Sequence, residues 1–178
     1  MTKVVNLFGG AGIGKTTLSA EVFVLMKKAR LNCELVREWI KAWAYEQRKI
    51  GPFDQFYIAG KQIRQESFLY DRVDYIVTDC PLWLGAAYET YYEGTHYIEQ
   101  HIKGFVEFAQ SRGVEYHNFL LERNFSYDPV GRFQNEEQAS ETDMIMKELL
   151  ERLNLPYQSL KMEPELRAQF IFDEIMKS

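Results

Sequence analysis

One short run of residues restricts the possible folds of this chain more than any other feature. It matches the pattern G-x-x-x-x-G-K-[ST] at every fixed position and reads Gly9-Gly10-Ala11-Gly12-Ile13-Gly14-Lys15-Thr16. The glycines let successive backbone N–H groups turn toward one anion, and a helix that begins there adds its partial positive charge. The run therefore predicts a phosphate-binding loop that joins a strand to a helix.

The flanking residues agree with this prediction. Residues 4–8 are mostly apolar, as in a parallel strand covered on both faces, and residues 15–30 carry apolar side chains at helical spacing. In such a loop the lysine, here Lys15, reaches the β- and γ-phosphates of ATP, and the hydroxyl of Thr16 binds Mg²⁺. We expect the residues from Gly9 to Thr17 to bind ATP and Mg²⁺ as a unit.

Strands and helices alternate along the rest of the chain. Short apolar strands are expected at residues 34–36, 73–78, 116–121 and 155–160, and helices at 38–49, 53–70 and 105–110. A capping box of Asn135 and Gln138 predicts the start of a further helix, and Glu163-Pro164 that of the last one. The alternation indicates an α/β fold with helices on both faces of a parallel sheet. Residues 1–178 are expected to form one domain.

Composition limits the classes of protein that the chain can belong to. It has 178 residues, 46% of them hydrophobic and 26% charged, which indicates a globular protein rather than a disordered one. Its net charge of −5 excludes a generally basic nucleic-acid coat, although a local basic groove would not show in the total. Two cysteines, Cys33 and Cys80, fit a reducing compartment, and no window supplies about 18 consecutive apolar residues. We expect a cytoplasmic protein with no membrane partner.

Two acidic residues follow predicted strands. Asp79 ends the β-branched segment 73–78, at the place where a phosphate-loop site needs a carboxylate near its metal ion. Glu38 follows the second strand; because the ends of parallel strands open toward one crevice, it is a candidate general base. The structural alternatives are a strand-end turn residue at Asp79 and a helix-first-turn acid at Glu38.

The polar segment 123–133 joins a predicted strand to the helix that follows Asn135. Its two arginines, Arg123 and Arg132, could close over ATP and neutralise charge on the transferring group. The alternative is a solvated surface loop. Because the preceding strand ends at the same crevice, we favour a lid.

These segments resemble a known group of proteins. The phosphate loop and residues 34–38, 76–82, 131–139 and 153–157 look like the corresponding parts of small P-loop kinases encoded by many bacteriophages. Such kinases are similar to the ribosylnicotinamide kinase domain of the bacterial NAD regulator and, more distantly, to deoxynucleoside kinases. The resemblance covers nearly the whole chain, and the phosphate loop is its one highly specific motif.

The resemblance implies phosphoryl transfer from ATP–Mg²⁺ to a hydroxyl group, in a P-loop kinase fold with a five-stranded parallel sheet of order 2-3-1-4-5. It implies that Lys15 and Thr16 hold phosphate and metal, and that Asp79 is the strand-end acid near the metal. Arg123 and Arg132 match lid arginines.

The resemblance also bears on the general base. Glu38 matches the acid that activates the acceptor hydroxyl in deoxynucleoside kinases. Those enzymes carry Arg-Ser after their strand-end acid, whereas this chain carries Cys80-Pro81 after Asp79. The base therefore stays open between Glu38 and Asp79, and a standard deoxynucleoside specificity is not implied.

Three functions follow from the sequence. We favour a kinase for a hydroxyl of a nucleoside, nucleotide or nucleobase-bearing acceptor. A second reading is a kinase for hydroxymethylpyrimidines in DNA, because some phage members of the group are similar to kinases that phosphorylate 5-hydroxymethyluracil within DNA. Aromatic and cationic side chains alternate in residues 37–49, which favours a polymer acceptor, while the acidic composition disfavours it. A third is an NTPase switch that acts on a protein partner.

Overall fold

The computed structural model describes residues 1–51, 53–123 and 135–178. At its centre lies a five-stranded sheet in which every pair of neighbours is parallel and the order is β2-β3-β1-β4-β5. The strands are β1 (Thr2–Phe8), β2 (Cys33–Val36), β3 (Tyr75–Thr78), β4 (Val114–Leu121) and β5 (Gln158–Leu160). The sheet order expected for a P-loop kinase is confirmed.

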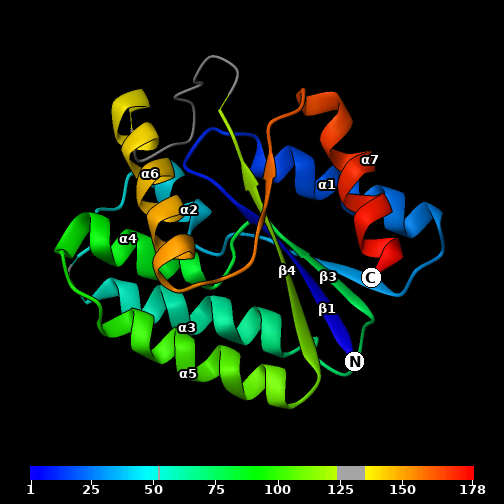
Figure 1. Cartoon of the computed structure of the whole chain (residues 1–178). Coiled ribbons are helices and arrows are strands. Elements are labelled where there is room, and N and C mark those ends of the chain that lie inside the picture. The colour runs from blue at the N-terminus through cyan, green and yellow to red at the C-terminus, as the bar shows by residue number, and fades with distance from the viewer. Residues whose placement is uncertain (52, 124–134) are drawn as a thin grey trace.

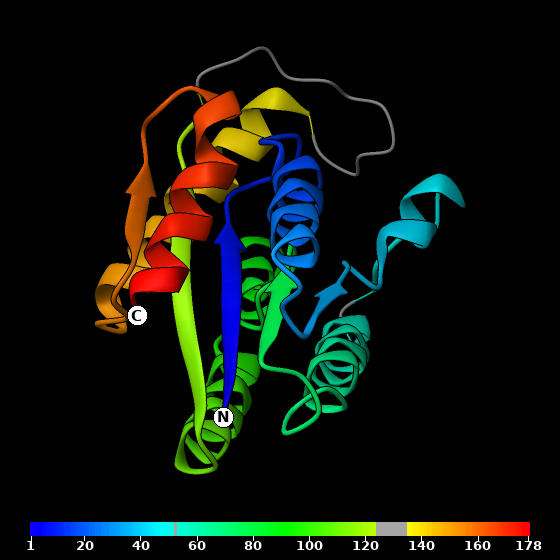
Figure 2. The same ribbon diagram turned by 90° about the vertical axis from the view of Figure 1, so that its right-hand side faces the viewer.

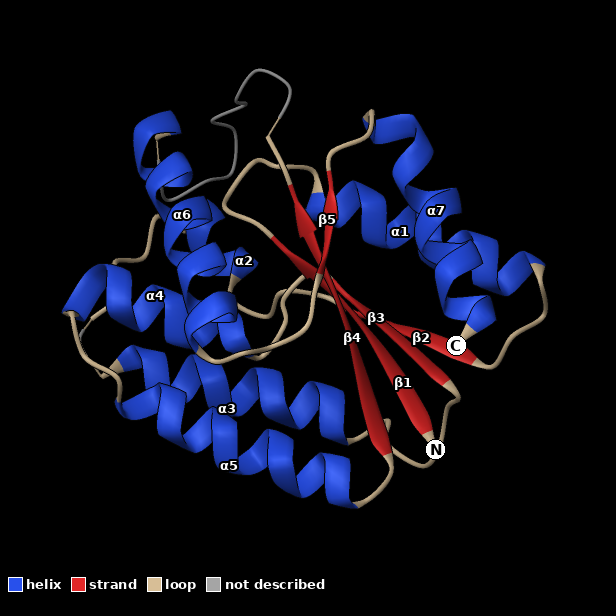
Figure 3. Ribbon diagram, in the orientation of Figure 1, coloured by secondary structure: helices blue, strands red, loops and turns tan. Residues whose placement is uncertain are grey.

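Helices connect the strands. In the described residues they are α1 (Lys15–Lys28), α2 (Lys41–Tyr45), α3 (Asp54–Ser67), α4 (Trp83–Glu93), α5 (Tyr97–Ser111), α6 (Glu136–Arg152) and α7 (Pro164–Lys177). Helices α1 and α7 cover one face of the sheet, and α4, α5 and α6 cover the other, with α3 beside α4 and α5 (Figures 1 and 3). None of the described helices has the length and apolar character needed to span a bilayer.

Each face of the sheet has its own apolar core because successive strand residues point to opposite faces. Val5 and Leu7 of β1 point toward α1 and α7, where they pack with Val22 and Ile171. Phe8 points the other way, into a cluster that α4, α5 and α6 complete. Strand β1 is buried on both faces, which explains why residues 4–8 are mostly apolar.

The structure differs from the sequence expectations at two helices, α2 and α4. The helix expected at 38–49 is only the five-residue α2, because residues 37–40 form a loop that ends in a turn, and Gln47 has a left-handed backbone with φ of 54°. Helix α4 is not indicated by the sequence pattern. Its first turns are buried on almost every side: Trp83, Leu84 and Ala87 are all buried residues of this helix. The helix therefore lacks the one-sided apolar stripe of a surface helix.

Other expectations agree more closely. The capping box at the start of α6 is present, with the Asn135 and Gln138 side chains each bonded to the other residue's N–H at 2.9 Å. Pro164 lies in the first turn of α7 as expected. Helix α5 is longer than the segment expected at 105–110, and β5 is shorter than the strand expected at 155–160, where Pro156 interrupts the run.

The parallel strands bring distant parts of the chain to one edge of the sheet. The phosphate loop follows β1, Glu38 comes shortly after β2, Asp79 follows β3 and Arg123 comes shortly after β4. Figure 2 shows β1 running from the N-terminus to this edge, where the chain turns into α1. In an open α/β sheet the carboxyl edge is where ligands bind.

Candidate active site

The phosphate loop has the backbone that its glycines were expected to provide. Gly14 is the N-cap of α1 with φ of 91°, and Gly9 has φ of 147°. Side chains with a Cβ rarely adopt either conformation, so both positions favour glycine. The Lys15 ammonium lies over the loop and donates to the carbonyl oxygens of Gly9, at 2.5 Å, and Gly10, at 2.8 Å.

Three carboxylates surround Lys15. Burial lowers the pKa of the Lys15 ammonium, while the negative charges of Glu38, Asp79 and Asp143 act in the opposite direction and raise it. These carboxylates come from three different parts of the chain: the loop after β2, the end of β3, and α6. The Lys15 ammonium therefore lies among acidic side chains at the edge of the sheet.

Glu38 and Asp79, the two candidate bases, are neighbours. The backbone N–H of Glu38 donates to Asp79 Oδ1 at 2.8 Å. Asp79 is buried, with 2% of its surface exposed, and Glu38 lines the pocket described below. The hydrogen bond fixes the loop after β2 against the end of β3, so both carboxylates lie close to the phosphate loop.

A Mg²⁺ ion that arrives with ATP needs only one or two protein oxygens in addition to phosphate oxygens and water. The donors that this site offers are the hydroxyl of Thr16, in the first turn of α1, and the carboxylate of Asp79. Both are hard oxygen ligands of the kind that Mg²⁺ prefers. The described residues contain no cluster of three or more His, Cys, Asp or Glu that could hold a metal ion by itself.

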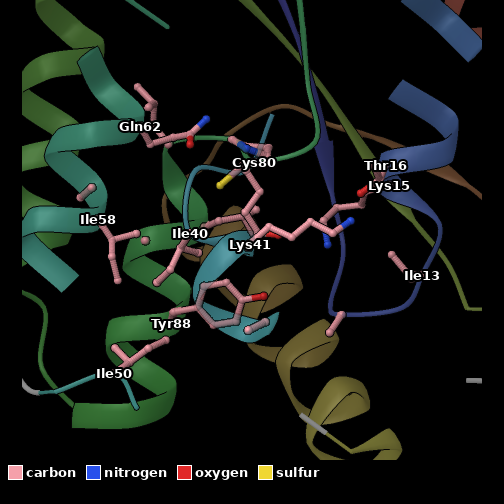
Figure 4. Close-up of a pocket in the computed structure, with 18 of the residues that line it drawn as sticks. Ile13, Lys15, Thr16, Ile40, Lys41, Ile50, Ile58, Gln62, Cys80 and Tyr88 are labelled. Atoms are coloured by element: carbon pink, nitrogen blue, oxygen red, sulfur yellow. The ribbon is translucent and has the colours of Figure 1, made fainter. Parts of the chain in front are cut away.

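A pocket extends from the phosphate loop between α2, α3 and α4. It has a volume of about 1090 Å³, including the part open to solvent. Lys15 and Thr16 lie at one end, and Ile58, Gln62 and Tyr88 lie toward the other (Figure 4). Apolar side chains from α3 and α4 and the segment around α2 line the far part of the pocket. The shape suits an elongated ligand whose phosphates lie in the loop and whose second component lies beyond it.

Polar groups in the far part of the pocket are few and buried. Gln62 is 4% exposed; its Oε1 accepts from the Trp39 N–H at 3.3 Å, and its Nε2 has no hydrogen-bond partner among the described atoms. Gln55, 3% exposed, lines the same wall. The Tyr88 hydroxyl has a pKa well above its usual value because it is buried and because Glu38 is close. It is therefore a neutral hydrogen-bond donor.

The first residue of the expected lid is held against the phosphate loop. Arg123 forms an ion pair with Asp143 of α6, with Nη2 at 2.8 Å from Oδ2, and donates from Nη2 to the Ala11 carbonyl at 3.0 Å. The rest of the expected lid, residues 124–133 including Arg132, lies outside the described residues. Arg123 is therefore at the phosphate loop, as a lid arginine would be.

Three residues of this site were not expected from the sequence: Gln62, Tyr88 and Asp143. Gln62 lies in α3, a helix that the pattern did predict, but a polar residue in a helix ordinarily faces solvent. Tyr88 lies in α4, which the pattern missed. Asp143 is two turns beyond a correctly predicted cap, and only the packing of α6 on the phosphate loop brings it to the site.

The fold and the phosphate loop together define a P-loop protein with the sheet order of kinases. A family model described as AAA domain (AAA_28) matches residues 4–167, so the chain belongs to this family of P-loop domains. A search of curated protein sequences finds no match.

Solved structures with this fold are similar over nearly the whole chain. A deoxyadenosine kinase of M. mycoides, solved with the products dCMP and dCDP, is 17% identical with a TM-score of 0.58, and 98% of this chain covers 97% of it. The same kinase with bound dATP is 14% identical with a TM-score of 0.59, over 99% of this chain and all of that one. NadR protein in complex with NR is 14% identical with a TM-score of 0.69, and 99% of this chain spans 50% of its length. At these identities the likeness shows the fold.

Proposed function

We propose that this protein is a kinase that transfers the γ-phosphoryl group of ATP–Mg²⁺ to a hydroxyl of a nucleoside, nucleotide or other nucleobase-bearing acceptor. The observation that carries the proposal is the pocket that extends from the phosphate loop to α3 and α4, with Glu38 and Lys15 both in its wall. Its far part is called the acceptor chamber below. A phosphoryl donor and a hydroxyl acceptor need this arrangement, because transfer requires both to be held in line.

In the proposed reaction the phosphate loop and Lys15 bind the β- and γ-phosphates. Thr16 and Asp79 would hold Mg²⁺, and a bound ion would supply positive charge next to the transferred group. Glu38 takes the proton of the acceptor hydroxyl, and Arg123 stabilises the transition state; the same role is proposed for Arg132, which lies outside the described residues. Asp79 is the alternative base, since its carboxylate is adjacent to Glu38.

The walls of the acceptor chamber support a nucleobase as the acceptor's binding element. A planar apolar ring would fit between Ile58 and Tyr88, and a carbonyl or ring nitrogen would satisfy the buried Nε2 of Gln62. A buried donor without a partner costs about 1–3 kcal/mol, which such a ligand would recover on binding. The structural likeness to a deoxyadenosine kinase and to NadR with NR is consistent with acceptors of this kind.

A second candidate, a kinase for hydroxymethylpyrimidines in DNA, is favoured by one surface. Beside the pocket, Trp39, Trp43 and Tyr57 pack together, with the Arg48 guanidinium 3.4 Å from the Trp43 ring centroid and the Lys61 ammonium 5.2 Å from that of Tyr57. Tyr45, Tyr57 and Phe53 are exposed. Aromatic rings interleaved with cations bind single-stranded nucleic acid, so a DNA strand could lie here with one base in the pocket.

The deciding experiment mixes the protein with Mg²⁺ and γ-labelled ATP and offers two acceptor pools. One pool holds free nucleosides, nucleotides and nicotinamide riboside, and the other holds DNA with and without hydroxymethylated pyrimidines. Label on a small molecule supports the first candidate. Label on modified DNA, with acceptor binding that weakens steeply as salt rises, supports the second. Release of free phosphate with no acceptor labelled contradicts both and favours an NTPase switch.

Two variants test whether the label comes from this site. Lys15→Ala should abolish transfer, because Lys15 supplies the positive charge at the β- and γ-phosphates. Lys28→Ala, an exposed lysine at the end of the same helix, should transfer at the wild-type rate. Equal rates in wild type and Lys15→Ala would refute the assignment of the phosphate loop as the donor site.

A further inference from the structure

Helix α6 lies directly on the backbone of the phosphate loop. A Cβ atom placed on Gly10 would be 2.5 Å from the Ala139 carbonyl oxygen and 2.7 Å from Asp143 Oδ1. Such approaches are closer than van der Waals contact allows, so the two segments meet with no space for a side chain between them. A displacement of α6 toward the phosphate loop must therefore move the loop as well.

One side chain on α6 bonds to both sides of this contact. Asp143 Oδ1 accepts a hydrogen bond from the backbone N–H of Gly10. Asp143 Oδ2 accepts a hydrogen bond from Arg123 Nε at 3.0 Å and forms an ion pair with Arg123 Nη2 at 2.8 Å. The Arg123 guanidinium in turn donates to the Ala11 carbonyl at 3.0 Å. Asp143, Arg123 and the first turn of the phosphate loop therefore form one closed ring of hydrogen-bonded groups.

The ion pair between Arg123 and Asp143 is mostly shielded from solvent, so it can fix the orientation of the Arg123 side chain. The side chains of Arg123 and Asp143 are 14% and 22% exposed. The hydrogen bond from Nε to Asp143 and the hydrogen bond from Nη2 to the Ala11 carbonyl together restrict the orientation of the guanidinium plane. Charge-assisted bonds such as the one to Asp143 are about twice as strong as neutral ones. Arg123 is consequently held at the edge of the phosphate site before any ligand arrives.

We propose that Asp143 is a positioning residue for the ATP site: it orients Arg123 and the first half of the phosphate loop so that both meet the triphosphate in the correct place. The inference rests on the proposed function, because it takes ATP as the ligand. Asp143 would act through these two partners and would not touch the nucleotide itself.

The direction in which Asp143→Asn changes the affinity for ATP separates a positioning role of Asp143 from the effect of its negative charge alone. Asp143 is a negative charge near a site for a polyanion, close enough to raise the pKa of Lys15. If only its charge mattered, Asp143→Asn would bind ATP more tightly. If Asp143 positions Arg123 and the loop, the same variant binds ATP more weakly.

The experiment measures binding of Mg²⁺ with a non-hydrolysable ATP analogue by calorimetry. We expect Asp143→Asn to raise the dissociation constant about tenfold, the size of effect typical of losing a charge-assisted hydrogen bond. Glu148→Gln is the matched control: it removes one charge from an exposed position on the same helix and should bind as wild type does. Unchanged or tighter binding by Asp143→Asn overturns the proposal.

A double variant tests whether Asp143 acts through Arg123. In the Arg123→Gln background, Asp143→Asn should cause much less than its own tenfold loss, because the partner that it orients is gone. If the increase in dissociation constant in the double variant equals the product of the increases in the two single variants, the proposal is overturned. If Asp143→Asn fails to fold, Asp143→Glu replaces it; this variant keeps the charge but displaces the carboxylate, so only positioning predicts weaker binding.

The readout does not depend on phosphoryl transfer. A wild-type protein that binds the analogue but labels no acceptor contradicts the proposed function and leaves the role of Asp143 standing. A wild-type protein that does not bind the analogue contradicts both.

Discussion

The backbone N–H of Glu38 donates a 2.8 Å hydrogen bond to the carboxylate of Asp79, a residue 41 positions further along the chain. The bond joins the loop after β2 to the end of β3 and sets the two acids of the site side by side. Because both acids lie close to the phosphate loop, the assignment of base and metal ligand must come from variants that change one acid at a time.

We expect Glu38→Gln to lower kcat by about 10²–10⁴-fold while leaving the affinity for Mg²⁺–ATP unchanged, because a general base contributes a factor of this size. Asp79→Asn should instead raise the Mg²⁺ concentration needed for half-maximal rate. Steady-state kinetics against acceptor and Mg²⁺ measure both. Glu46→Gln, an exposed acid next to α2, serves as the control. The reverse pattern, with the larger kcat loss in Asp79→Asn at saturating Mg²⁺, would identify Asp79 as the base.

Gln62 should determine how well the acceptor binds. Gln62→Leu keeps the approximate size of the side chain and removes both hydrogen-bonding groups, so kcat/KM for a nucleobase-bearing acceptor should fall about 10–100-fold. Affinity for the ATP analogue should not change. Gln110→Leu, on the exposed side of α5, is the matched control. An acceptor KM and kcat that are both unaffected in Gln62→Leu would exclude this wall from acceptor recognition.

A buried acid away from the phosphate loop makes stability depend on pH. Glu66 of α3 has no exposed surface, and the Tyr70 hydroxyl donates to its Oε1 at 2.5 Å while the Tyr116 hydroxyl lies 2.8 Å from that of Tyr70. Burial raises the pKa of Glu66 from 4.5 to about 7, against the smaller opposing effect of these hydroxyls. The folded protein therefore keeps a proton that the unfolded chain releases.

The sign of this dependence follows from proton binding. Between pH 4.5 and about 7 the folded state holds more protons than the unfolded state at Glu66, so the free energy of unfolding falls as pH rises across this window. The loss is on the order of 3 kcal/mol when complete. Glu66→Gln should remove it, and should be more stable than wild type at pH 8 by urea unfolding. The exposed Glu107→Gln should keep the wild-type pH profile; a flat wild-type profile would contradict the prediction.

Two glycines should respond in opposite ways to alanine. Gly10→Ala forces its Cβ into the Ala139 carbonyl, so α6 or the phosphate loop must move, at a cost of about 1–3 kcal/mol. Gly60 lies within α3, and no atom lies within 4 Å of the position that its Cβ would take, so Gly60→Ala should stabilise the protein by about 1 kcal/mol through helix propensity. Urea unfolding of both variants measures the two effects, and destabilisation by Gly60→Ala would show that this face of α3 is not open.

The donor half of the site could be predicted because it is local in sequence. A phosphate loop needs its glycines, lysine and threonine at fixed spacing, so one run of residues specifies it without reference to the rest of the chain. The same is true of the cap of α6, where Asn135 and Gln138 bond to each other. The strand-end position of Asp79 also followed from pattern, since a β-branched run shows where a strand stops.

The acceptor half could not be predicted in the same way. Trp83, Leu84 and Ala87 are all buried, so α4 carries no one-sided stripe, and the wall to which Tyr88 belongs was missed with it. The helix expected from Glu38 onward begins only at Lys41, because the backbone N–H of Glu38 is bonded to Asp79 in the loop after β2.

Local sequence is thus enough to specify the phosphate loop, the α/β class and the edge of the sheet at which the site lies, because each depends on residues close together or on a repeating pattern. Which side chains close the site depends on the tertiary structure. Gln62 and Asp143 are ordinary polar residues of helices by pattern, and they reach the pocket and the phosphate loop because α3 and α6 pack where they do. Contacts of this kind depend on the relative placement of whole elements, which no local spacing encodes.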